Sequence, residues 1–431
     1  MPGQPVDIAL AALELAQTGR FAAIRDLFAP RLQALVAPEA LEAAWKSELD
    51  RRGAVTSTGG PVSEPGPAGV VVVKVPVTCQ AGGFALIASV TEAGRLAGLQ
   101  LAPLSAAAPI APWEPPEYAD PESFDEHEVA LGSGPLAVSG TTSVPRGPAR
   151  VPAVVLLAGS GSLDRDETIG RNKPLKDVAW GLASRGIAVL RFDKVTYAHA
   201  SELRDASQFT LDDEYLPQAL AAVGLLQTHP AVDRARVFLL GHSLGGTVAP
   251  RIVMADPSIA GIVMLAGGAA PMHWVIVRQF RYLASLRPES EAASQPMIET
   301  LTEQARLIDS PELTASTPAE RLPFGAPASY WLDVRGYDAA GLAATLGKPM
   351  LILQGARDYQ VTVADDLARW EAALDGRPGV TIRVYPDLNH LFAPGSGPSS
   401  PAEYEPAQHV DPTVVEDIAS WLTSVDHGQP G

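Results

Sequence analysis

A short apolar run that ends in Gly-x-Ser-x-Gly constrains the fold of this chain more than any other feature. Residues 236–246 read Arg-Val-Phe-Leu-Leu-Gly-His-Ser-Leu-Gly-Gly, and a helix-compatible stretch follows. The order is therefore strand, tight turn, helix, and Ser243 stands on the turn with its hydroxyl pushed above the sheet. Gly241 and Gly245 flank Ser243 where a side chain would clash with the neighbouring strand and helix. The pattern also occurs by chance, but the buried strand before it and Gly246 after it favour a nucleophilic serine.

The composition is that of a globular protein with room for two domains. The chain has 431 residues, of which 46% are hydrophobic and 19% charged, so it can bury a large core. Its formal net charge of −17 repels phosphate backbones and anionic lipid. We therefore expect neither nucleic acid nor a membrane surface as a partner.

The ends and the cysteine content limit other classes of protein. The sequence contains no uninterrupted stretch of about 18 apolar residues, so no membrane span is predicted. The N-terminus lacks a basic start followed by an apolar run, so no signal peptide is predicted and we expect a cytoplasmic protein. Cys79 is the one cysteine, which excludes an internal disulfide and a Cys-based metal site.

The first hundred residues predict a small α+β domain, residues 1–104. Apolar residues recur at helical spacing in a helix that stops at Gly19, a second over 21–35, and a third over 38–53. Residues 71–101 then alternate with period two around glycine turns, which predicts an antiparallel meander. The segment holds no catalytic cluster, so we expect a packing or dimerisation module. Edge-to-edge pairing of its meander would give a homodimer.

A linker and a larger domain follow. Residues 105–121 are rich in proline and alanine, and such a segment is semi-rigid and extended. From 122 to 431 strand-like and helix-like stretches alternate, which predicts an α/β fold with a mainly parallel sheet and helices on both faces. The expected strands cover 128–131, 136–141, 151–158, 187–192, 237–240, 259–265, 350–354 and 381–385.

The alternation stops between residues 268 and 346. This stretch has helical spacing and interrupts the sheet between two strands. Insertions there lie over the C-terminal edge of the strands, where ligands bind in open α/β folds. We therefore predict a helical cap insertion over the active site. Most of its aromatic residues would pack against the main domain, and Trp274 is the candidate for lining a substrate pocket.

A serine nucleophile needs a base within reach, and the base needs an acid to orient it. In this arrangement the partners follow in the order Ser, Asp or Glu, His. Asp358 comes just after a predicted strand, and His390 comes just after the last one. Both loops belong to the sheet edge that carries Ser243, so we predict a Ser243–His390–Asp358 triad. His273, at the start of the cap, is the second choice for the base.

The tetrahedral intermediate needs two backbone N–H groups aimed at its oxyanion. One is expected from Leu244, which follows the nucleophile. The other is expected from Ser160 in the loop after strand 151–158, with Gly161 as the alternative donor and as a substrate-contacting residue. The charged run 164–166 beside this loop is interpreted as an ion-pair network that fixes the loop, and Arg191 with Asp193 is expected to brace the same edge.

These motifs resemble the α/β-hydrolase family. Gly-His-Ser-Leu-Gly-Gly, Gly-Ala-Arg-Asp and Leu-Asn-His match its nucleophile, acid and histidine positions, and the resemblance covers about residues 125 to 425. The loop from Gly159 to Pro174 is similar to that of bacterial esterases near the dienelactone-hydrolase and acyl-peptidase branches. The N-terminal segment resembles a small NTF2-like domain. Two departures are Ala158 where many esterases have His, and Ser243 where dienelactone hydrolases have Cys.

The resemblance implies a serine carboxylesterase for small or short-chain esters, working through an acyl-enzyme without metal or organic cofactor. The expected partner is a small-molecule ester. Acyltransferase, thioesterase and serine peptidase activities remain alternatives, because the same triad serves them all and a fold alone does not separate them. A non-catalytic binding protein is disfavoured, since all three triad residue types occur in order.

Overall fold

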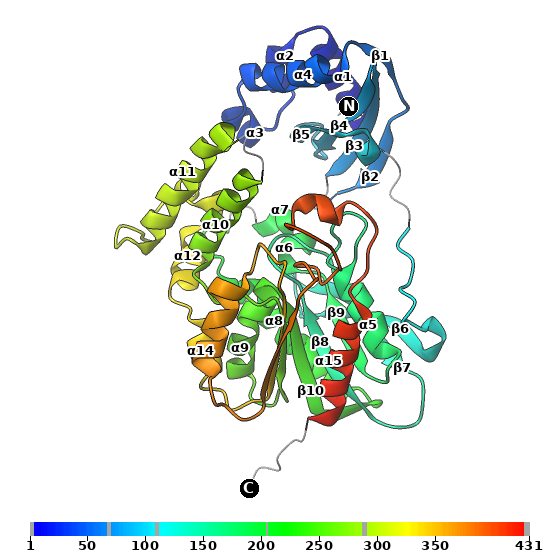
Figure 1. The fold of residues 1–431 in the computed structure, drawn as a ribbon, viewed down its shortest axis with the longest axis vertical. Helices are drawn as coiled ribbons and strands as arrows, with labels where there is room; N and C mark the ends of the chain where they lie inside the picture. Colours follow the sequence, from blue (N-terminus) through cyan, green and yellow to red (C-terminus); the bar gives the residue numbers. More distant parts are fainter. Residues whose placement is uncertain (1–3, 67–69, 108–111, 204–205, 287–290, 426–431) are drawn as a thin grey trace. The chain divides into compact units, whose positions relative to one another are not determined.

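The computed structural model describes residues 4–66, 70–107, 112–203, 206–286 and 291–425. Internal contacts divide the chain into two compact units, residues 1–111 and 112–431 (Figure 1). Each unit has its own hydrophobic core. The two units are described separately below.

The first unit contains helices followed by an antiparallel sheet. Its helices are α1 (Pro5–Gln17), α2 (Phe21–Asp26), α3 (Pro30–Leu35) and α4 (Pro38–Arg52). Its strands are β1 (Val55–Thr58), β2 (Val62–Pro65), β3 (Val71–Cys79), β4 (Gly82–Val90) and β5 (Leu96–Pro103). Among the described residues the sheet order is β1-β3-β4-β5, with β2 also paired to β3.

Alternation along β3 explains how this sheet is covered. Val73, Val75 and Val77 are fully buried, as a strand with one face on a core requires. Helix α1 packs on that face, and on α4 the Trp45 ring meets Phe84 of β4 edge-on, with centroids 5.3 Å apart. The helices-then-meander prediction for this segment therefore matches the architecture.

Two details of the first unit differ from the prediction. The helix expected over 21–35 is two helices, because Pro30 has no N–H to continue α2 and instead begins α3. Strands β1 and β2 were not expected, since their side chains are mostly exposed and show no apolar alternation.

The second unit is built on a mixed sheet whose described strands run in the order β13-β12-β11-β10-β8-β9-β7-β6. Strands β8 to β13 pair in parallel, whereas β6–β7 and β7–β9 pair antiparallel. The bounds are β6 (Phe124–Leu131), β7 (Val138–Pro145), β8 (Val151–Leu157), β9 (Ala188–Phe192), β10 (Val232–His242), β11 (Ile262–Leu265), β12 (Met350–Gly355) and β13 (Val380–Tyr385). The predicted α/β class and parallel sheet are confirmed.

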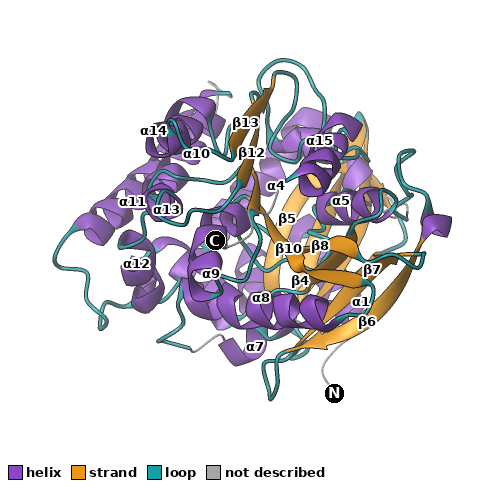
Figure 2. Cartoon of the chain, turned by 90° about the horizontal axis from the view of Figure 1, so that it is seen from below, coloured by secondary structure: helices purple, strands orange, loops and turns teal. Residues whose placement is uncertain are grey.

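Helices cover both faces of this sheet, as Figure 2 shows. Helices α5 (Pro174–Ala183) and α15 (Pro412–Ser424) pack on one face, and α8 (Leu211–Thr228) and α9 (Leu244–Ala255) pack on the other. The central strands are therefore buried on both sides and consist of continuous apolar runs. Short helices α6 (Val195–Ala198) and α7 (Ala200–Leu203) follow β9, and α14 (Ala368–Leu374) follows β12.

Among the described residues, four α-helices and two short 3-10 helices lie between β11 and β12, and the α-helices are the larger elements. They are α10 (Met272–Ser285), α11 (Glu291–Asp309), α12 (Ala328–Arg335) and α13 (Ala339–Ala343). We refer to them as the inserted helices. Their buried residues join the same core as α8 and α9, so they belong to the second unit.

The second half of the predicted linker packs against the second unit. Trp113 stacks edge-on against Trp180 of α5, with centroids 5.0 Å apart, and its Nε1 donates to Asp177. The Tyr118 hydroxyl donates to the Val410 carbonyl. Residues 108–111 of this segment lie outside the described residues.

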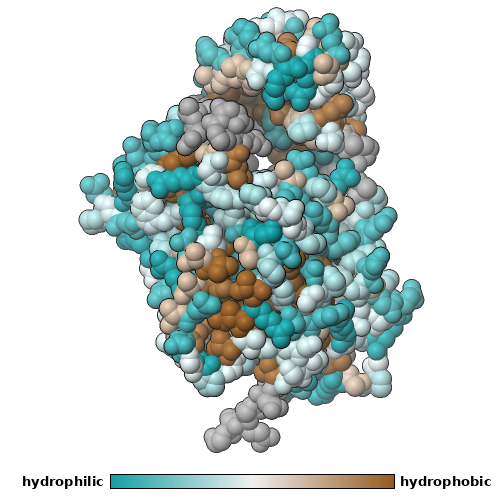
Figure 3. All heavy atoms as spheres, in the orientation of Figure 1, coloured by the Kyte–Doolittle hydropathy of each residue, from teal (hydrophilic) through white to brown (hydrophobic). Residues whose placement is uncertain are grey.

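Both hydrophilic and hydrophobic side chains lie on the surface. The face in Figure 3 is largely hydrophilic, with apolar side chains gathered in one area of the second unit. None of the described helices combines the length and the apolar character needed to cross a bilayer.

Candidate active site

Ser243 stands on a strained turn between β10 and α9. Its φ of 52° and ψ of −119° lie in a region that non-glycine residues rarely adopt. Its N–H donates to the Leu265 carbonyl at the end of β11, 2.8 Å away. The turn therefore holds Ser243 at the C-terminal edge of the parallel strands, where ligands bind in such sheets.

The two glycines beside Ser243 are required by close packing. A Cβ on Gly241 would lie 2.2 Å from the backbone carbonyl carbon of Gly245. A Cβ on Gly245 would lie 2.3 Å from the carbonyl oxygen of Leu157 in β8. Neither distance is compatible with a side chain, so the strand, turn and helix approach each other this closely only with glycine at both positions.

Asp358 and His390 form a buried hydrogen-bonded pair. His390 Nδ1 lies 2.6 Å from Asp358 Oδ2, and each residue is 4% exposed. Asp358 Oδ1 also accepts from the backbone N–H groups of Gln360 and Val361, at 2.7 and 3.0 Å. The carboxylate is thus held by its own loop while it orients the imidazole, which leaves Nε2 as the free nitrogen of the ring.

The loop that carries His390 is fixed by its neighbour Asn389. The Asn389 Oδ1 atom accepts from the N–H groups of Leu391 and Ala393, and its Nδ2 donates to Glu403. His242, inside the elbow, contacts the base loop as well, with ring centroids of His242 and His390 4.7 Å apart. Within the described residues the Ser243 hydroxyl itself makes no hydrogen bond; in free enzymes such bonds are often long and tighten with substrate.

The residues predicted to hold the oxyanion lie around one cavity with the nucleophile. Ser160, Gly161, Ser243 and Leu244 all line a cavity of about 570 Å³. Among the described residues, the backbone N–H groups of Ser160 and Leu244 donate to no other atom of the chain. Both are therefore free to bind an anionic oxygen. Asp358 and His390 lie outside this lining.

The rest of the cavity wall is mainly apolar and comes largely from the segment between β11 and β12, which contains the inserted helices. No lysine, arginine or histidine lines it, and its one carboxylate, Glu214, is paired with Lys194 at 2.7 Å. The cavity therefore suits an uncharged ligand. Its apolar lining residues besides Leu244 and the glycines are Phe209, Ala270, Met272, Val275, Ile276, Phe324, Ala326, Pro327, Tyr330, Trp331 and Val361.

Trp274 and His273 are not part of this lining. The Trp274 Nε1 atom donates to Asp309 at 2.7 Å, and His273 Nε2 lies 2.8 Å from the same carboxylate. Burial lowers the pKa of His273 despite the nearby Asp309. Both residues tie α10 to the end of α11. Both side chains are held by Asp309 and neither lines the cavity that contains Ser243.

The inserted helices are tied to the loop that carries Asp358. Arg278 of α10 donates to the Gln360 carbonyl at 3.0 Å and to Asp366 at 2.6 Å. Asp366, which is fully buried, also accepts from the N–H groups of Ala269 and Ala270 at 3.2 and 3.0 Å. One carboxylate therefore joins the start of the insertion, α10 and the acid loop.

The charged run beside the oxyanion loop forms the predicted kind of ion-pair network. Arg165 pairs with Asp193 and Glu128, and Asp166 pairs with Arg191 and Lys173. Burial opposes the ionised form of Asp166, but Arg191 and Lys173 outweigh it and lower the pKa of this carboxyl. These side chains cross-link the loop to β6, β9 and α5 and do not line the cavity.

Four buried polar residues at this edge were missed by sequence reasoning. They contact the oxyanion loop or the elbow through hydrogen bonds and are each at most 3% exposed: Glu167, Lys194, Tyr215 and His242. Polar residues are rarely this buried without a partner. The ionisable side chains at the end of strand 187–192 were a sequence signal for polar residues at this edge. From the sequence, a bracing role was assigned to Arg191 and Asp193, and Lys194 was overlooked.

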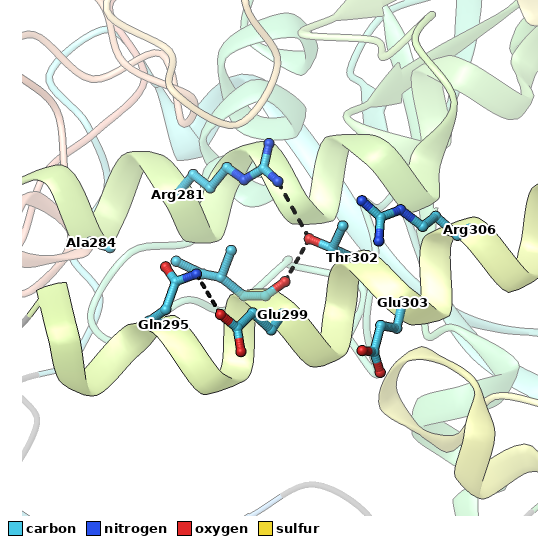
Figure 4. A pocket seen from close by; sticks show the side chains of 8 residues that line it. Arg281, Ala284, Gln295, Glu299, Thr302, Glu303 and Arg306 are labelled. Carbon is cyan, nitrogen blue, oxygen red and sulfur yellow. Dashed lines mark hydrogen bonds between the residues drawn. The ribbon is translucent and has the colours of Figure 1, made fainter.

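A second, more polar cavity lies between α10 and α11 (Figure 4). It measures about 480 Å³, and Arg281 donates across it to Thr302. Its remaining polar lining consists of Gln295, Glu299, Glu303 and Arg306, without a histidine. It contains no histidine paired with an orienting carboxylate, and Ser243 does not line it, so we do not regard it as the active site. Among the described residues, no group of three or more His, Cys, Asp or Glu side chains could hold a metal ion.

Comparisons with known proteins show which family and which proteins the chain resembles. Residues 154–407 match the model of the "Alpha/beta hydrolase family". The chain is 40% identical over 342 residues to Esterase EstD of Thermotoga maritima, covering 79% of this chain and 77% of that protein. Among solved structures it resembles Est1E from Butyrivibrio proteoclasticus (16% identity, TM-score 0.45, 69% of this chain and 97% of that one). It also resembles a dienelactone hydrolase from Anabaena variabilis (16% identity, TM-score 0.41, 70% and 98%).

Proposed function

Because this chain belongs to the alpha/beta hydrolase family, we propose that it is a serine carboxylesterase with Ser243 as nucleophile, His390 as base and Asp358 as the orienting acid. One observation carries the assignment. Asp358 follows β12 and His390 follows β13, and their buried side chains are joined at 2.6 Å. Both residues lie after the C-terminal ends of parallel strands, as does Ser243, which stands on a strained turn after β10. The similarity to Esterase EstD supports ester bonds as the target.

The reaction proceeds through an acyl-enzyme. The Ser243 oxygen attacks the ester carbonyl while His390 Nε2 takes the hydroxyl proton, and the tetrahedral oxyanion accepts from the N–H groups of Ser160 and Leu244. Collapse breaks the bond to the alcohol oxygen, which receives the proton from His390. Water then attacks the acyl-enzyme by the same proton route and releases the carboxylic acid.

The substrate is a small, uncharged ester. A cavity of about 570 Å³ with a mainly apolar wall accepts a short acyl chain and a modest alcohol. No described cationic side chain lines the cavity. A free carboxylate on the acyl chain would therefore lose its hydration on binding without gaining an ion-pair partner. Gly161 lines the cavity, which supports its proposed contact with substrate, whereas Trp274 does not line it.

Turnover of p-nitrophenyl acetate and butyrate tests the assignment. We expect wild type to hydrolyse both and Ser243→Ala to lose activity by several orders of magnitude, while Ser258→Ala, at an exposed serine, matches wild type. A fluorophosphonate should label wild type and the control but not Ser243→Ala. Equal rates for wild type and Ser243→Ala would remove the triad assignment, and no turnover by wild type would favour a binding protein.

The same triad could serve thioesters, amides or acyl transfer. Rates on matched oxygen esters, thioesters and aminoacyl amides distinguish esterase, thioesterase and peptidase activity. Ester formation with an added alcohol reports acyl transfer. We expect the oxygen ester to have the highest kcat/KM, since 79% of the chain aligns with a protein named as an esterase.

The remaining predictions concern the whole chain. We retain residues 1–104 as a small domain of NTF2-like character, 105–121 as a linker and 122–431 as the catalytic domain, with a cap over about 268–346. A cytoplasmic location and a homodimer also stay predictions. Light scattering during size-exclusion chromatography, with the full chain and with 1–104 removed, tests the dimer.

A further inference from the structure

The two peptide groups that lead into Ser160 are held by buried side chains. In the first, the Ala158 carbonyl accepts from the Tyr215 hydroxyl at 2.9 Å, and the Gly159 N–H donates to Glu167 at 3.0 Å. In the second, the Gly159 carbonyl accepts from Lys194 Nζ at 2.7 Å and lies 2.9 Å from the Tyr215 hydroxyl. Of the four polar atoms in these two groups, only the Ser160 N–H has no partner among the described residues.

Lys194 is placed so that all three of its ammonium hydrogens are used. Nζ contacts the Gly159 carbonyl at 2.7 Å, Glu214 Oε1 at 2.7 Å and the Tyr215 hydroxyl oxygen at 2.9 Å. The side chain is 2% exposed. A buried ammonium is costly unless it is paired and fully hydrogen-bonded, so this lysine has one stable orientation, and that orientation fixes the Gly159 carbonyl.

Tyr215 completes the arrangement. Burial, and then the nearby Glu214, raises the pKa of the phenol well above its usual value. The hydroxyl therefore keeps its proton, accepts from Lys194 and donates its hydrogen to the carbonyls of Ala158 and Gly159. Both helper residues are anchored outside the loop: Lys194 follows β9, and Tyr215 lies on α8.

Because the peptide group is planar, fixing the Gly159 carbonyl also fixes the direction of the Ser160 N–H. In a trans peptide the carbonyl and the next N–H lie in one rigid plane and point in opposite directions within it. Holding the Gly159 carbonyl towards Lys194 therefore turns the Ser160 N–H away from Lys194, on the loop that lines the Ser243 cavity. We propose that Lys194, with Tyr215, is a positioning residue of the oxyanion hole, which acts by fixing the Gly159–Ser160 peptide plane.

The inference rests on the proposed function, because it concerns a donor that matters only when an oxyanion forms. It predicts that removal of Lys194 weakens stabilisation of the transition state and has little effect on the affinity for the ground-state ester. Lys194 does not line the cavity, so removing it takes no contact away from the bound ester. A purely structural role would instead reduce stability and all affinities together.

The test compares Lys194→Met with Lys74→Met in the full-length protein. Lys74 is also buried and paired with a carboxylate, Glu64 at 2.6 Å, but it lies in the first unit. We measure kcat and KM for p-nitrophenyl butyrate, and inhibition by hexyl trifluoromethyl ketone and hexyl methyl ketone. Only the trifluoromethyl ketone readily adds the serine oxygen and places an oxyanion in the hole.

For Lys194→Met we expect kcat and the affinity for the trifluoromethyl ketone to fall together by roughly 10- to 100-fold, approaching the loss of one oxyanion donor. The methyl ketone affinity and KM should change by less than about threefold. Lys74→Met should match wild type in all four quantities. The inference is overturned if kcat is retained, or if both ketones lose affinity by the same factor.

Two further variants cover a failure of Lys194→Met to fold, since it leaves Glu214 without its cation. Tyr215→Phe removes only a hydroxyl outside the cavity lining and should give the same split between the two ketones. Lys194→Met/Glu214→Gln removes the pair; because Glu214 lines the cavity, this variant is compared with Glu214→Gln and should show the same split relative to it. If wild type hydrolyses esters through Ser243 but these variants equal it, only this inference fails. If wild type shows no Ser243-dependent hydrolysis, the proposed function fails and the inference with it.

Discussion

His242 Nε2 donates to the backbone carbonyl of His390, 2.9 Å away. Its other ring nitrogen, Nδ1, lies 2.8 Å from Glu167 Oε1, the same oxygen that accepts from the Gly159 N–H. The residue next to Ser243 thus connects the loop that carries His390 to the loop that contains Gly159 and Glu167. Because both nitrogens face acceptors, the ring is a cation when Glu167 is ionised.

The first prediction concerns the pH dependence of stability. Burial disfavours the charged His242 ring, but Glu167, the His390 carbonyl and Asp358 outweigh it and raise the pKa of His242 above its usual value. A raised histidine pKa contributes stability that is complete below the unfolded value of about 6.5 and is lost as pH rises through the folded value. Glu167→Gln should therefore lower Tm most near pH 6, with a gap to wild type that narrows towards pH 9.

The matched control for this prediction is His127→Gln, at an exposed histidine in β6. Its Tm should follow wild type across the range. Thermal unfolding by circular dichroism gives both curves. A gap between wild type and Glu167→Gln that stays constant with pH would mean that the pair does not hold a charged imidazole.

The second prediction separates the two carboxylates near the base. Asp358→Asn keeps the shape of the side chain but favours the wrong histidine tautomer, so kcat should fall by roughly 10⁴-fold. Asp387→Asn, at an exposed position three residues before His390, should leave kcat unchanged. Steady-state kinetics on p-nitrophenyl butyrate decide, and a large effect at Asp387 with none at Asp358 would reverse the assignment of the acid.

The third prediction uses the close packing of Gly159. A Cβ there would lie 2.8 Å from Glu167 Oε1 and 3.1 Å from the Ser243 Cβ. Gly159→Ala should displace the oxyanion loop and reduce kcat by roughly 10- to 100-fold. In contrast, Gly224→Ala on α8 meets nothing within 4 Å and should stabilise the protein by about 0.5–1 kcal/mol without changing kcat. Full activity of Gly159→Ala would contradict the packing argument.

The fourth prediction concerns Phe324, which lines the cavity, is 64% exposed and has a φ of 56°. This left-handed backbone costs an L-residue with a Cβ roughly 1 kcal/mol. Phe324→Gly should therefore be more stable than Phe324→Ala by about 1 kcal/mol. Both variants lose the ring, so they should shift acyl-chain preference in the same way. Urea unfolding measures the stability difference, and rates on esters of increasing acyl-chain length measure the preference. Equal stabilities of Phe324→Gly and Phe324→Ala would contradict the backbone argument.

Local patterns explain what the sequence could predict. Ser243, Asp358 and His390 each follow an apolar strand, so their place at one sheet edge depends only on strand order and parallel pairing. The Leu244 donor follows from the turn itself. The helix that ends at Gly53 was also readable, because Gly53 has a φ of 76°, which favours glycine.

Long-range pairing explains what could not be predicted. Glu167 and His242 are 75 residues apart, and Lys194 and Tyr215 are 21 apart, so no spacing rule connects them. Trp274 looked like a pocket aromatic because its helix borders the cavity, but which side of a helix faces a ligand depends on its packing. The choice was settled by Asp309, which holds the indole N–H from 35 residues away.

The Asp366 link between α10 and the acid loop has a consequence for recombination among relatives. Exchanging the inserted helices would seem the simplest way to transfer substrate preference, since they form much of the cavity wall. Yet Arg278 and the backbone of 269–270 share one buried carboxylate with the loop that positions Asp358. A graft that breaks this contact disturbs the acid as well as the pocket, so the natural crossover points for chimeras lie outside 266–366, not at the ends of the insertion.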